Sequence, residues 1–268
     1  MGELVFVGLG LAGERGMTLR GLDETLEADL VFAEFYTSPV PNDLLPRLKA
    51  LTRREVAVLG RSQLEEEMGR LVLEAAKGRK VVLLVPGDPL IATTHVSLRL
   101  AAFKQGIQTR VVNAPSIVTA AIGASGLQNY RFGASFTVPS SSASLPDSLY
   151  DVAKDNLSRG LHTFIFLDVG CEGEAGMTIG DAVNRLLKAE GRRGESVFPH
   201  DRLAVGLARL GSDMPVVKAD LLERLARHGF GDVPHCLILP GRLHFMEVEA
   251  LRSFAGAPEE ALMRAAQG

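Results

Sequence analysis

The stretch Val81-Val82-Leu83-Leu84-Val85-Pro86-Gly87-Asp88-Pro89 decides the fold class of this chain. Five successive apolar residues, three of them valine, predict a strand that is buried on both faces, as in a parallel sheet. The run Pro-Gly-Asp-Pro then disfavours both a continued strand and an immediate helix. Asp88 is thereby held on a stiff turn at the carboxyl end of a buried strand, where open α/β sheets bind their ligands. The plainer interpretation is an aspartate that bonds to its own loop.

Strands and helices alternate on both sides of this stretch. In the first half, apolar runs predict strands over residues 4–8, 30–33, 55–59, 80–85 and 108–113. A helix is predicted over 18–28, with Thr18 as its N-cap and with Leu19, Leu22 and Leu26 on the core face. This alternation indicates a mostly parallel sheet.

A further helix is predicted from the capping box Ser62-Gln63-Leu64-Glu65 to about Lys77. Its core stripe would consist of Leu64, Met68, Leu71, Val72 and Ala75. The helix after the Pro-Gly-Asp-Pro turn is expected to be capped by Thr93, Thr94 and His95, and to end at Gly106.

The second half predicts a mixed arrangement of strands and helices. A helix should begin after Ala114-Pro115-Ser116, with strands at 136–138, 163–168, 203–207 and 236–239. Between the last two strands we expect a helix around residues 220–227, and the chain should end in two short helices. We predict a domain boundary near Asn113–Ala114, which gives an α/β domain over 1–113 and a second α/β domain, with a mixed sheet, over 114–268.

Composition bounds the class of protein. The 268 residues are 46% hydrophobic and 23% charged, which is typical of a soluble globular protein of one large or two ordinary domains. A net charge of −3 predicts no nucleic-acid partner, and the absence of a long apolar run or a leader-like start predicts a cytoplasmic protein without a membrane partner. The six histidines show no metal-ligand spacing. Cys171 and Cys236 are expected to be reduced and structural.

The segment Gly8-Leu9-Gly10-Leu11-Ala12-Gly13 matches the glycine pattern of dinucleotide-binding proteins, and Glu34 stands about 20 residues beyond it, where an acidic residue would bind the ribose. In that motif, however, the helix begins within the glycine pattern. Here Glu14-Arg15-Gly16-Met17 delays the helix, so its N-terminus cannot be aimed at a pyrophosphate. We favour a glycine-rich turn that a ligand approaches closely, with a dinucleotide-dependent oxidoreductase as the competing hypothesis.

Six segments together resemble the diphthine synthase family, and they run in order along nearly the whole chain. They are Gly8-Leu-Gly-Leu11, Val31-Phe-Ala-Glu-Phe-Tyr-Thr-Ser38, Pro86-Gly-Asp-Pro-Leu-Ile-Ala-Thr-Thr-His95, Ala114-Pro-Ser-Ile117, Gly160-Leu-His-Thr163 and Gly229-Phe-Gly-Asp-Val-Pro-His-Cys-Leu-Ile-Leu-Pro-Gly241. The Gly-Asp-Pro element alone would indicate the broader superfamily of tetrapyrrole methylase-like proteins. The remaining segments narrow the resemblance to this member.

The resemblance implies an S-adenosylmethionine-dependent methyltransferase of the class III type, with the cofactor in the cleft between two α/β domains. In the family, the substrate is a histidine of translation elongation factor 2 that carries a 3-amino-3-carboxypropyl group. Its amino nitrogen is methylated towards diphthine, three times in archaeal-type members, and the product of the cofactor is S-adenosylhomocysteine. A homodimer without a metal is implied as well. By motif, the cofactor contacts fall on Leu11, Asp88, Ile91, Ser116, Ile117, Leu167, Leu210 and His235.

This chemistry is compatible with the residues. Methyl transfer is an in-line displacement from a sulfonium, so alignment and exclusion of water matter more than a metal or a covalent nucleophile. We expect Asp88 near the cationic methionine end of the cofactor, and backbone groups near Ile117 and Leu210 at the adenine. No side chain marks itself as the base, and water could take the proton. Tyr130-Arg131-Phe132 could contact the substrate or pack in the core.

Two further hypotheses compete with a diphthine-forming enzyme. A tetrapyrrole (precorrin-type) methyltransferase would share the fold and the cofactor but act on a small macrocycle, and the family-specific segments disfavour it. A non-enzymatic cofactor-sensing or translation-associated module would bind without transferring a methyl group. Label from S-adenosylmethionine that appears on the elongation factor distinguishes the enzyme from both.

Overall fold

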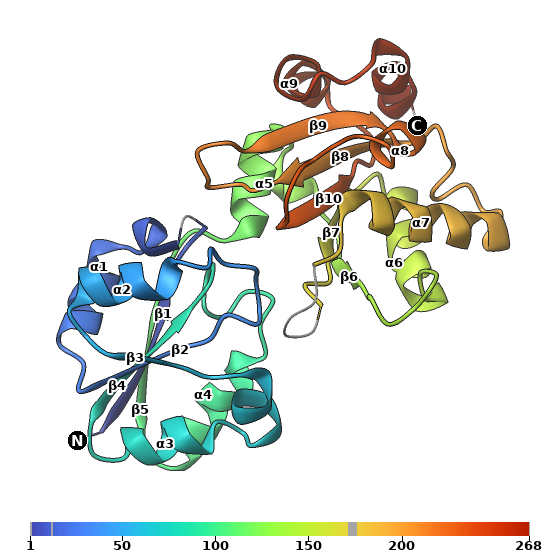
Figure 1. The fold of residues 1–268 in the computed structure, drawn as a ribbon. Helices are drawn as coiled ribbons and strands as arrows, with labels where there is room; N and C mark the ends of the chain where they lie inside the picture. The colour runs from blue at the N-terminus through green and yellow to red at the C-terminus, as the bar shows by residue number, and fades with distance from the viewer. Residues whose placement is uncertain (1, 12, 171–175, 268) are drawn as a thin grey trace. The chain divides into compact units, whose positions relative to one another are not determined.

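The computed structural model of the protein describes residues 2–11, 13–170 and 176–267, so Cys171 lies outside the described residues. Contacts along the chain separate two compact units, Met1–Ile117 and Val118–Gly268 (Figure 1). The sequence predicted the boundary at Asn113–Ala114. The segment that follows Asn113 stays with the first unit because Ala114 packs against the first strand: a Cβ built on Gly8 would lie 2.7 Å from the Cβ of Ala114.

The first unit contains a five-stranded sheet in which all neighbouring strands are parallel. The strand order is β3-β2-β4-β1-β5. The strands are β1 (Glu3–Gly8), β2 (Leu30–Ala33), β3 (Val56–Val58), β4 (Lys80–Val85) and β5 (Gln108–Val112). The predicted α/β fold class with a parallel N-terminal sheet is therefore confirmed, and the opening stretch forms the central strand β4.

Helices cover both faces of this sheet. They are α1 (Leu19–Leu26), α2 (Leu44–Thr52), α3 (Arg70–Ala76) and α4 (His95–Lys104), with a 3-10 turn η1 (Gly13–Gly16) and a π-helical turn η2 (Ser62–Glu66). Leu4 and Phe6 of β1 pack in the cluster with α3 and α4, whereas Val5 and Val7 pack in the cluster with α2. Since successive residues of a strand point to opposite faces, burial on both sides requires the uninterrupted apolar run seen in the sequence.

The predicted core face of α1 is wrong. Leu19 is 82% exposed and Leu26 is 37% exposed, while Gly21, Glu24 and Thr25 are buried. Gly21 sets this orientation because a Cβ there would lie 2.8 Å from Cγ1 of Val7 in β1, so the helix approaches the sheet along its glycine. The predicted N-cap is confirmed, since the Thr18 side chain accepts a hydrogen bond from the Gly21 N–H.

The helix predicted over Ser62–Lys77 is also corrected. It is interrupted at Met68 and Gly69, both of which have positive φ, and Met68 is exposed. A Cβ on Gly69 would lie 2.5 Å from Cδ1 of Leu98, so α4 packs directly over the break. The predicted capping box does not form, and the Glu65 side chain instead accepts a hydrogen bond from the Thr94 hydroxyl. Of the predicted stripe, Leu64 and Val72 are buried whereas Leu71 is exposed.

The second unit contains a five-stranded mixed sheet in the order β6-β7-β10-β8-β9. The β6–β7 pair is parallel, and the other three pairs are antiparallel. The strands are β6 (Phe136–Val138), β7 (Thr163–Leu167), β8 (Leu203–Ala208), β9 (Val216–Leu221) and β10 (His235–Leu239). The predicted mixed sheet of the C-terminal domain is confirmed.

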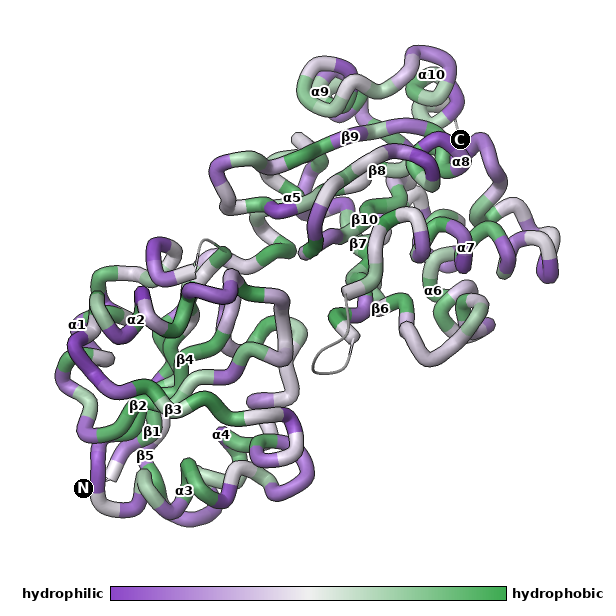
Figure 2. Tube along the Cα trace, viewed as in Figure 1, coloured by the Kyte–Doolittle hydropathy of each residue, from purple (hydrophilic) through white to green (hydrophobic). Residues whose placement is uncertain are grey.

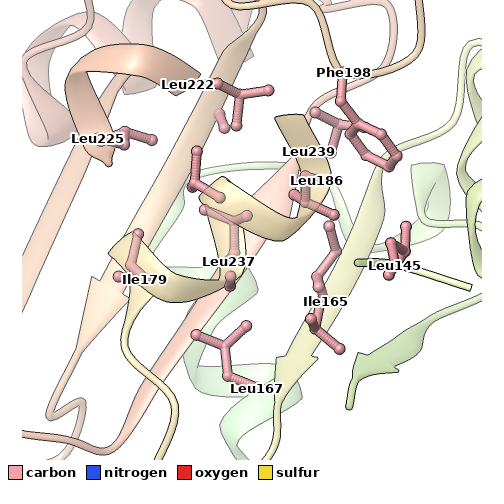
Figure 3. Close-up of a cluster of buried hydrophobic side chains, with 14 of the residues drawn as sticks. Leu145, Ile165, Leu167, Ile179, Leu186, Phe198, Leu222, Leu225, Leu237 and Leu239 are labelled. Atoms are coloured by element: carbon pink, nitrogen blue, oxygen red, sulfur yellow. The ribbon is translucent and has the colours of Figure 1, made fainter. Parts of the chain in front are cut away.

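The helices of the second unit complete its layers. They are α5 (Ile117–Ser125), η3 (Asn129–Arg131), α6 (Asp147–Ser158), α7 (Ile179–Arg193), α8 (Leu222–Leu225), α9 (Phe245–Ala255) and α10 (Glu259–Gln267). Leucines and isoleucines of β7, β10, α7 and α8 meet in one buried cluster, with Phe198 at its side (Figure 3). In Figure 2 the strands β4 and β10 are coloured mainly as hydrophobic, whereas β9 and the helices alternate between the two colours. Cys236 is buried in β10, and burial raises the pKa of its thiol to about 12.

Strand β9 was missed by the sequence patterns, which predicted a helix around Asp220–Arg227. The alternation Val-Val-Lys-Ala-Asp-Leu is too polar to mark a buried strand, yet it pairs along its whole length with β8. The helix that follows, α8, is a single turn. Among the described residues, no helix is long and apolar enough to cross a membrane.

Candidate functional site

The carboxyl edge of the first sheet is where its loops diverge. Strands β1 and β4 are neighbours, but the chain leaves β1 towards α1 and leaves β4 towards α4. The core clusters place α2 with one face of the sheet and α3 and α4 with the other. In open α/β sheets, ligands bind in the crevice that such a reversal creates. The loops after β1, β4 and β5 are therefore the candidate site of this unit.

Two of these loops are joined by their backbones. The N–H of Gly10 donates to the Gly87 carbonyl at 3.1 Å, and the N–H of Gly87 donates to the Gly10 carbonyl at 2.9 Å. Both glycines have positive φ, of 66° and 69°, a conformation that side chains disfavour. The glycine-rich segment and the Pro-Gly-Asp-Pro turn thus form one rigid surface.

Asp88 directly follows Gly87 and is 7% exposed. Its Oδ1 accepts a hydrogen bond from the Leu90 N–H at 3.2 Å, and its Oδ2 accepts one from Nδ2 of Asn113 at 2.9 Å. The Asp88 carbonyl accepts from the Ile91 N–H at 3.3 Å. Asp88 therefore does bond to its own loop, as in the plainer interpretation, and it also ties that loop to the end of β5. Each carboxylate oxygen retains acceptor capacity for a further donor.

The other predicted site residues of the first unit lie after the same strand as Asp88 or after the strands next to it. Leu11 follows β1 and is half-buried, and Ile91 follows β4 with 48% of its surface exposed. Ser116 and Ile117 follow β5, and Ser116 is buried. Because β4, β1 and β5 are adjacent in the sheet, the structure brings this set to one edge.

Leu167, Leu210 and His235 gather at one end of the second sheet. Leu167 ends β7 and His235 begins the antiparallel strand β10, whose partner opposite His235 is Ala208 at the end of β8. Leu210 lies in the turn after β8 and is 8% exposed. The three residues therefore share one edge of their own sheet, although they are far apart in the sequence.

The imidazole of His235 is held by its own unit. Nδ1 accepts a hydrogen bond from the Ile179 N–H at 3.2 Å, and Nε2 lies 3.0 Å from the Asp232 carbonyl. A carbonyl can only accept, so the proton belongs on Nε2 and the ring is neutral. Burial lowers the pKa of His235, which agrees with the neutral form. The side chain of His235 therefore has a structural role, and this leaves its backbone available for the predicted contact with a ligand.

The hypothesis of a dinucleotide-binding protein is not supported. The helix after the glycine pattern begins at Leu19, and the 3-10 turn Gly13–Gly16 intervenes. Glu34, the candidate ribose ligand, is fully buried. Its Oε2 accepts from the N–H groups of Tyr36 and Thr37, so its side chain serves its own loop. A carboxylate bound in this way has no access to a ribose.

Some site residues were missed by sequence reasoning. Asn113 was treated as a boundary residue, yet it holds the Asp88 carboxylate. His95 was expected to cap α4, but Nε2 of its ring lies 3.2 Å from Oε1 of Glu34. Thr94 occupies the N-cap position of α4 without a side-chain cap, and its hydroxyl donates to Glu65. The available signal for Asn113 was its position directly after a predicted strand. The strand order was needed to show that the end of this strand lies near the turn that carries Asp88.

The segment Tyr130-Arg131-Phe132 belongs to the other end of the second sheet. Arg131 contacts Glu247 through Nη1 at 3.3 Å, and the Phe132 ring packs edge-on against His162, which precedes β7. Arg131 is therefore engaged in an ion pair and Phe132 in a ring contact, both half-buried, while Tyr130 is exposed. Among the described residues, no group of three or more His, Cys, Asp or Glu side chains could hold a metal ion.

Replacing Gly10 with alanine should destabilise the first unit by about 1–3 kcal/mol and weaken ligand binding at its carboxyl edge. A Cβ at this position would lie 2.5 Å from the Gly16 carbonyl oxygen, on a backbone with φ of 66°. Thermal unfolding measures the loss. Gly78→Ala is the control, because a Cβ there would meet no heavy atom within 4 Å. Equal melting temperatures of the two variants would contradict the strained role of Gly10.

The chain is similar in sequence to a known protein family and to named proteins. Residues 3–225 match the model of the Tetrapyrrole (Corrin/Porphyrin) Methylases. Diphthine synthase of Methanococcoides burtonii is 44% identical over 96% of this chain and 97% of its own length. That of Methanothermobacter thermautotrophicus is 40% identical over 97% and 98% of the two chains.

Solved structures agree with this comparison. A crystal structure of diphthine synthase superimposes with a TM-score of 0.87 at 42% identity, covering 97% of this chain and 98% of its own. The match therefore extends over both units. The chain belongs to the tetrapyrrole (corrin/porphyrin) methylase family, and its relatives over nearly the full length include diphthine synthases.

Proposed function

We propose that the protein is an S-adenosylmethionine-dependent N-methyltransferase that forms diphthine. Its substrate would be the 3-amino-3-carboxypropyl-histidine of translation elongation factor 2. The observation that carries this proposal is the full-length similarity, at 40–44% identity, to proteins named diphthine synthase. The family model alone would also allow a tetrapyrrole substrate.

The residues at the carboxyl edge of the first sheet suit such a cofactor. Asp88 provides a buried carboxylate with remaining acceptor capacity, and Ile91 provides an exposed aliphatic side chain beside it. At Gly87 a Cβ would meet no heavy atom within 4 Å, so the turn leaves open space next to its backbone. A ligand with an ammonium group and an aliphatic chain that carries a sulfonium, or a thioether after methyl transfer, suits this combination.

We assign the cofactor contacts to Leu11, Asp88, Ile91, Ser116, Ile117, Leu167, Leu210 and His235. S-adenosylmethionine, when bound, supplies a methyl group activated on a sulfonium sulfur. In our assignment the Asp88 carboxylate accepts from the ammonium of the methionine end, and backbone groups next to Ile117 and Leu210 recognise the adenine. The apolar side chains exclude water around these contacts, which strengthens each of them. Orientation of this kind can supply about 7–11 kcal/mol of the barrier reduction.

The accepting amine would react as the free base, because its nitrogen lone pair would form the new bond to the methyl carbon. The bond from that carbon to sulfur would break at the same time and leave its electron pair on sulfur, which gives S-adenosylhomocysteine. The proton of the amine is lost to solvent before the attack in our proposal, and the chain contributes alignment. A homodimer and a cytoplasmic location are also proposed, on the resemblance to the family. Light scattering of the purified protein measures the first, and imaging of the tagged protein in its cell measures the second.

Incubation with methyl-labelled S-adenosylmethionine should transfer label to elongation factor 2 that carries the 3-amino-3-carboxypropyl-histidine. Mass spectrometry of the modified peptide gives the site and the number of methyl groups. The control is the same factor with that histidine replaced by alanine, which should stay unlabelled. Label on a precorrin instead of on the factor would favour a tetrapyrrole methyltransferase. Binding of NAD without binding of S-adenosylhomocysteine would refute the proposal.

A further inference from the structure

A buried glutamate–histidine pair lies in the first unit outside the assigned cofactor contacts. Glu34 is fully buried and His95 is 2% exposed, with 3.2 Å between Oε1 and Nε2. The carboxylate also accepts hydrogen bonds from the Tyr36 N–H at 3.0 Å, the Thr37 N–H at 3.1 Å and the Thr37 hydroxyl at 2.5 Å. Burial of a carboxylate is costly, and four contacts of this kind offset the cost.

The pair joins two loops that leave the same edge of the sheet. Glu34 directly follows β2, and its N–H donates to the Leu84 carbonyl of β4 at 3.1 Å. His95 is the first residue of α4, directly after the loop 86–94 that carries Asp88 and Ile91. The negative charge of Glu34 thus lies beside the N-terminus of α4, where the helix dipole favours it.

The loop 86–94 is consequently anchored at three places. Two of them lie at its beginning, namely the two hydrogen bonds between Gly10 and Gly87 and the hydrogen bond between Asp88 and Asn113. The third is its end, where His95 lies against Glu34 and the Thr94 hydroxyl donates to Glu65. Between the last two anchors, Ala92 has a positive φ of 57°, which a residue with a Cβ adopts at a cost. Without His95, the end of this strained segment keeps the exposed hydrogen bond from the Thr94 hydroxyl to Glu65 but loses its buried anchor.

Tyr36 packs over the pair. Its ring meets the His95 ring edge-on, with 6.4 Å between the centroids, and the Arg61 guanidinium lies 5.3 Å from the Tyr36 centroid. Burial, together with the carboxylates of Glu34 and Glu65, raises the pKa of the Tyr36 hydroxyl. The pair is therefore enclosed on the side of the loop 35–37 and is kept in one orientation.

We propose that Glu34 and His95 are positioning residues that hold the loop 86–94 in the conformation that binds the cofactor. They act through Asp88 and Ile91 rather than by touching the ligand. This inference rests on the proposed function for the identity of the ligand. The cause is geometric: a hydrogen-bonded carboxylate fixes both distance and direction, which apolar packing at the start of α4 would not do.

The second unit contains a comparable buried pair, which belongs to a different compact unit from that loop. His162 and Glu247 are both buried, with 2.9 Å between Nε2 and Oε1. His162 immediately precedes β7, whereas Leu167 ends that strand, so the pair lies at the sheet end away from Leu167 and His235. Its loss should cost stability without altering the assigned contacts. It is the control for general destabilisation.

Binding of S-adenosylhomocysteine by calorimetry, well below the melting temperature of each variant, tests the inference. We expect His95→Ala to raise the dissociation constant by about tenfold or more, and His95→Gln, which keeps a donor, to restore part of the affinity. His162→Ala should lower the melting temperature at least as much and change the dissociation constant less than about twofold. In the methyl-transfer assay, the KM for S-adenosylmethionine should rise more than kcat falls in His95→Ala. An unchanged dissociation constant in His95→Ala, or equal increases in both alanine variants, would overturn the inference.

Hydrogen exchange provides a readout that does not require ligand. In His95→Ala, or in Glu34→Gln where His95→Ala does not fold, peptides covering 86–94 should exchange faster than in the wild type. Peptides covering β7 should be unchanged. Wild-type protein that binds no S-adenosylhomocysteine would refute the proposed function, and the exchange measurement would still decide whether the pair orders the loop. Unchanged exchange in 86–94 would overturn the positioning role.

Discussion

Asp88→Ala should weaken the binding of S-adenosylhomocysteine by about ten- to a hundredfold, which corresponds to roughly 1.5–3 kcal/mol for a charge-assisted hydrogen bond. Two effects add. The proposed contact with the ammonium group of the ligand is lost, and the Leu90 N–H and the Asn113 amide lose the acceptor that holds them. Calorimetric titration of wild type and variant measures the change, and Asp88→Asn separates the loss of charge from the loss of shape.

Asp29→Ala is the matched control for Asp88. Asp29 accepts a hydrogen bond from the Lys80 N–H at 2.8 Å, at the amino end of the same strand β4 whose carboxyl end leads to Asp88. This variant should lose some stability and keep its affinity. If Asp88→Ala binds the ligand as tightly as Asp29→Ala does, the carboxylate is not a contact, and the backbone of the turn carries the binding.

Glu247→Ala should lower the free energy of unfolding by about 3–5 kcal/mol, because it breaks a buried pair and leaves donors without an acceptor. Glu247 is 1% exposed and accepts from Nε2 of His162, from the Gln128 N–H at 2.8 Å and from the His244 N–H at 2.8 Å. Chemical denaturation measures the loss. Glu249→Ala, on the same helix but paired with Arg252 at the surface, should change stability by less than about 1 kcal/mol.

The pH dependence of stability provides a second check on Glu247. Burial raises the pKa of this carboxyl, but the hydrogen bonds from His162 and from the backbone N–H groups of His244 and Gln128 lower it to about 2. The folded-state pKa is thus below the unfolded value of 4.5, so the stabilisation is fully present above about pH 4.5. It is lost as the pH falls towards 2, by about 3 kcal/mol in total. A wild-type stability that falls no more steeply over this range than that of Glu247→Gln would contradict the assignment.

Local patterns in the sequence predicted most strands and helices correctly because each depends on the spacing of apolar residues within a few turns. These patterns failed where a tertiary contact with a residue distant in the sequence determined which face of an element is buried or where a helix ends. In α1, Gly21 packs against Val7, and Leu19 is exposed on the other side. Before α3, Gly69 packs against Leu98, and the neighbouring Met68 is exposed. The prediction of β9 failed for a related reason. Its backbone pairing with β8 stabilises the strand although its residues are too polar for the strand pattern.

In the candidate site, too, local motifs were predicted correctly, whereas contacts between distant residues were not. The motif Pro-Gly-Asp-Pro was enough to place a ligand-binding turn at the end of a buried strand, and the structure places that turn at the reversal of the sheet. The sequence could not name Asn113 as the partner of Asp88, because that contact depends on β1 lying between β4 and β5. It also offered Glu34 as a ribose ligand, whereas the fold buries it against His95.

The sequence by itself determined the α/β class, the two-unit organisation and the resemblance to a methyltransferase family, since these follow from periodicity and from motifs that are contiguous in the chain. The tertiary structure alone decided which face of α1 is buried, which acids are held by which partners, and which loops share an edge. The physical reason is that the hydrogen bonds between Glu34 and His95 and between Asp88 and Asn113 join segments that follow different strands of the sheet. Their partners are set by strand order, which no local pattern encodes.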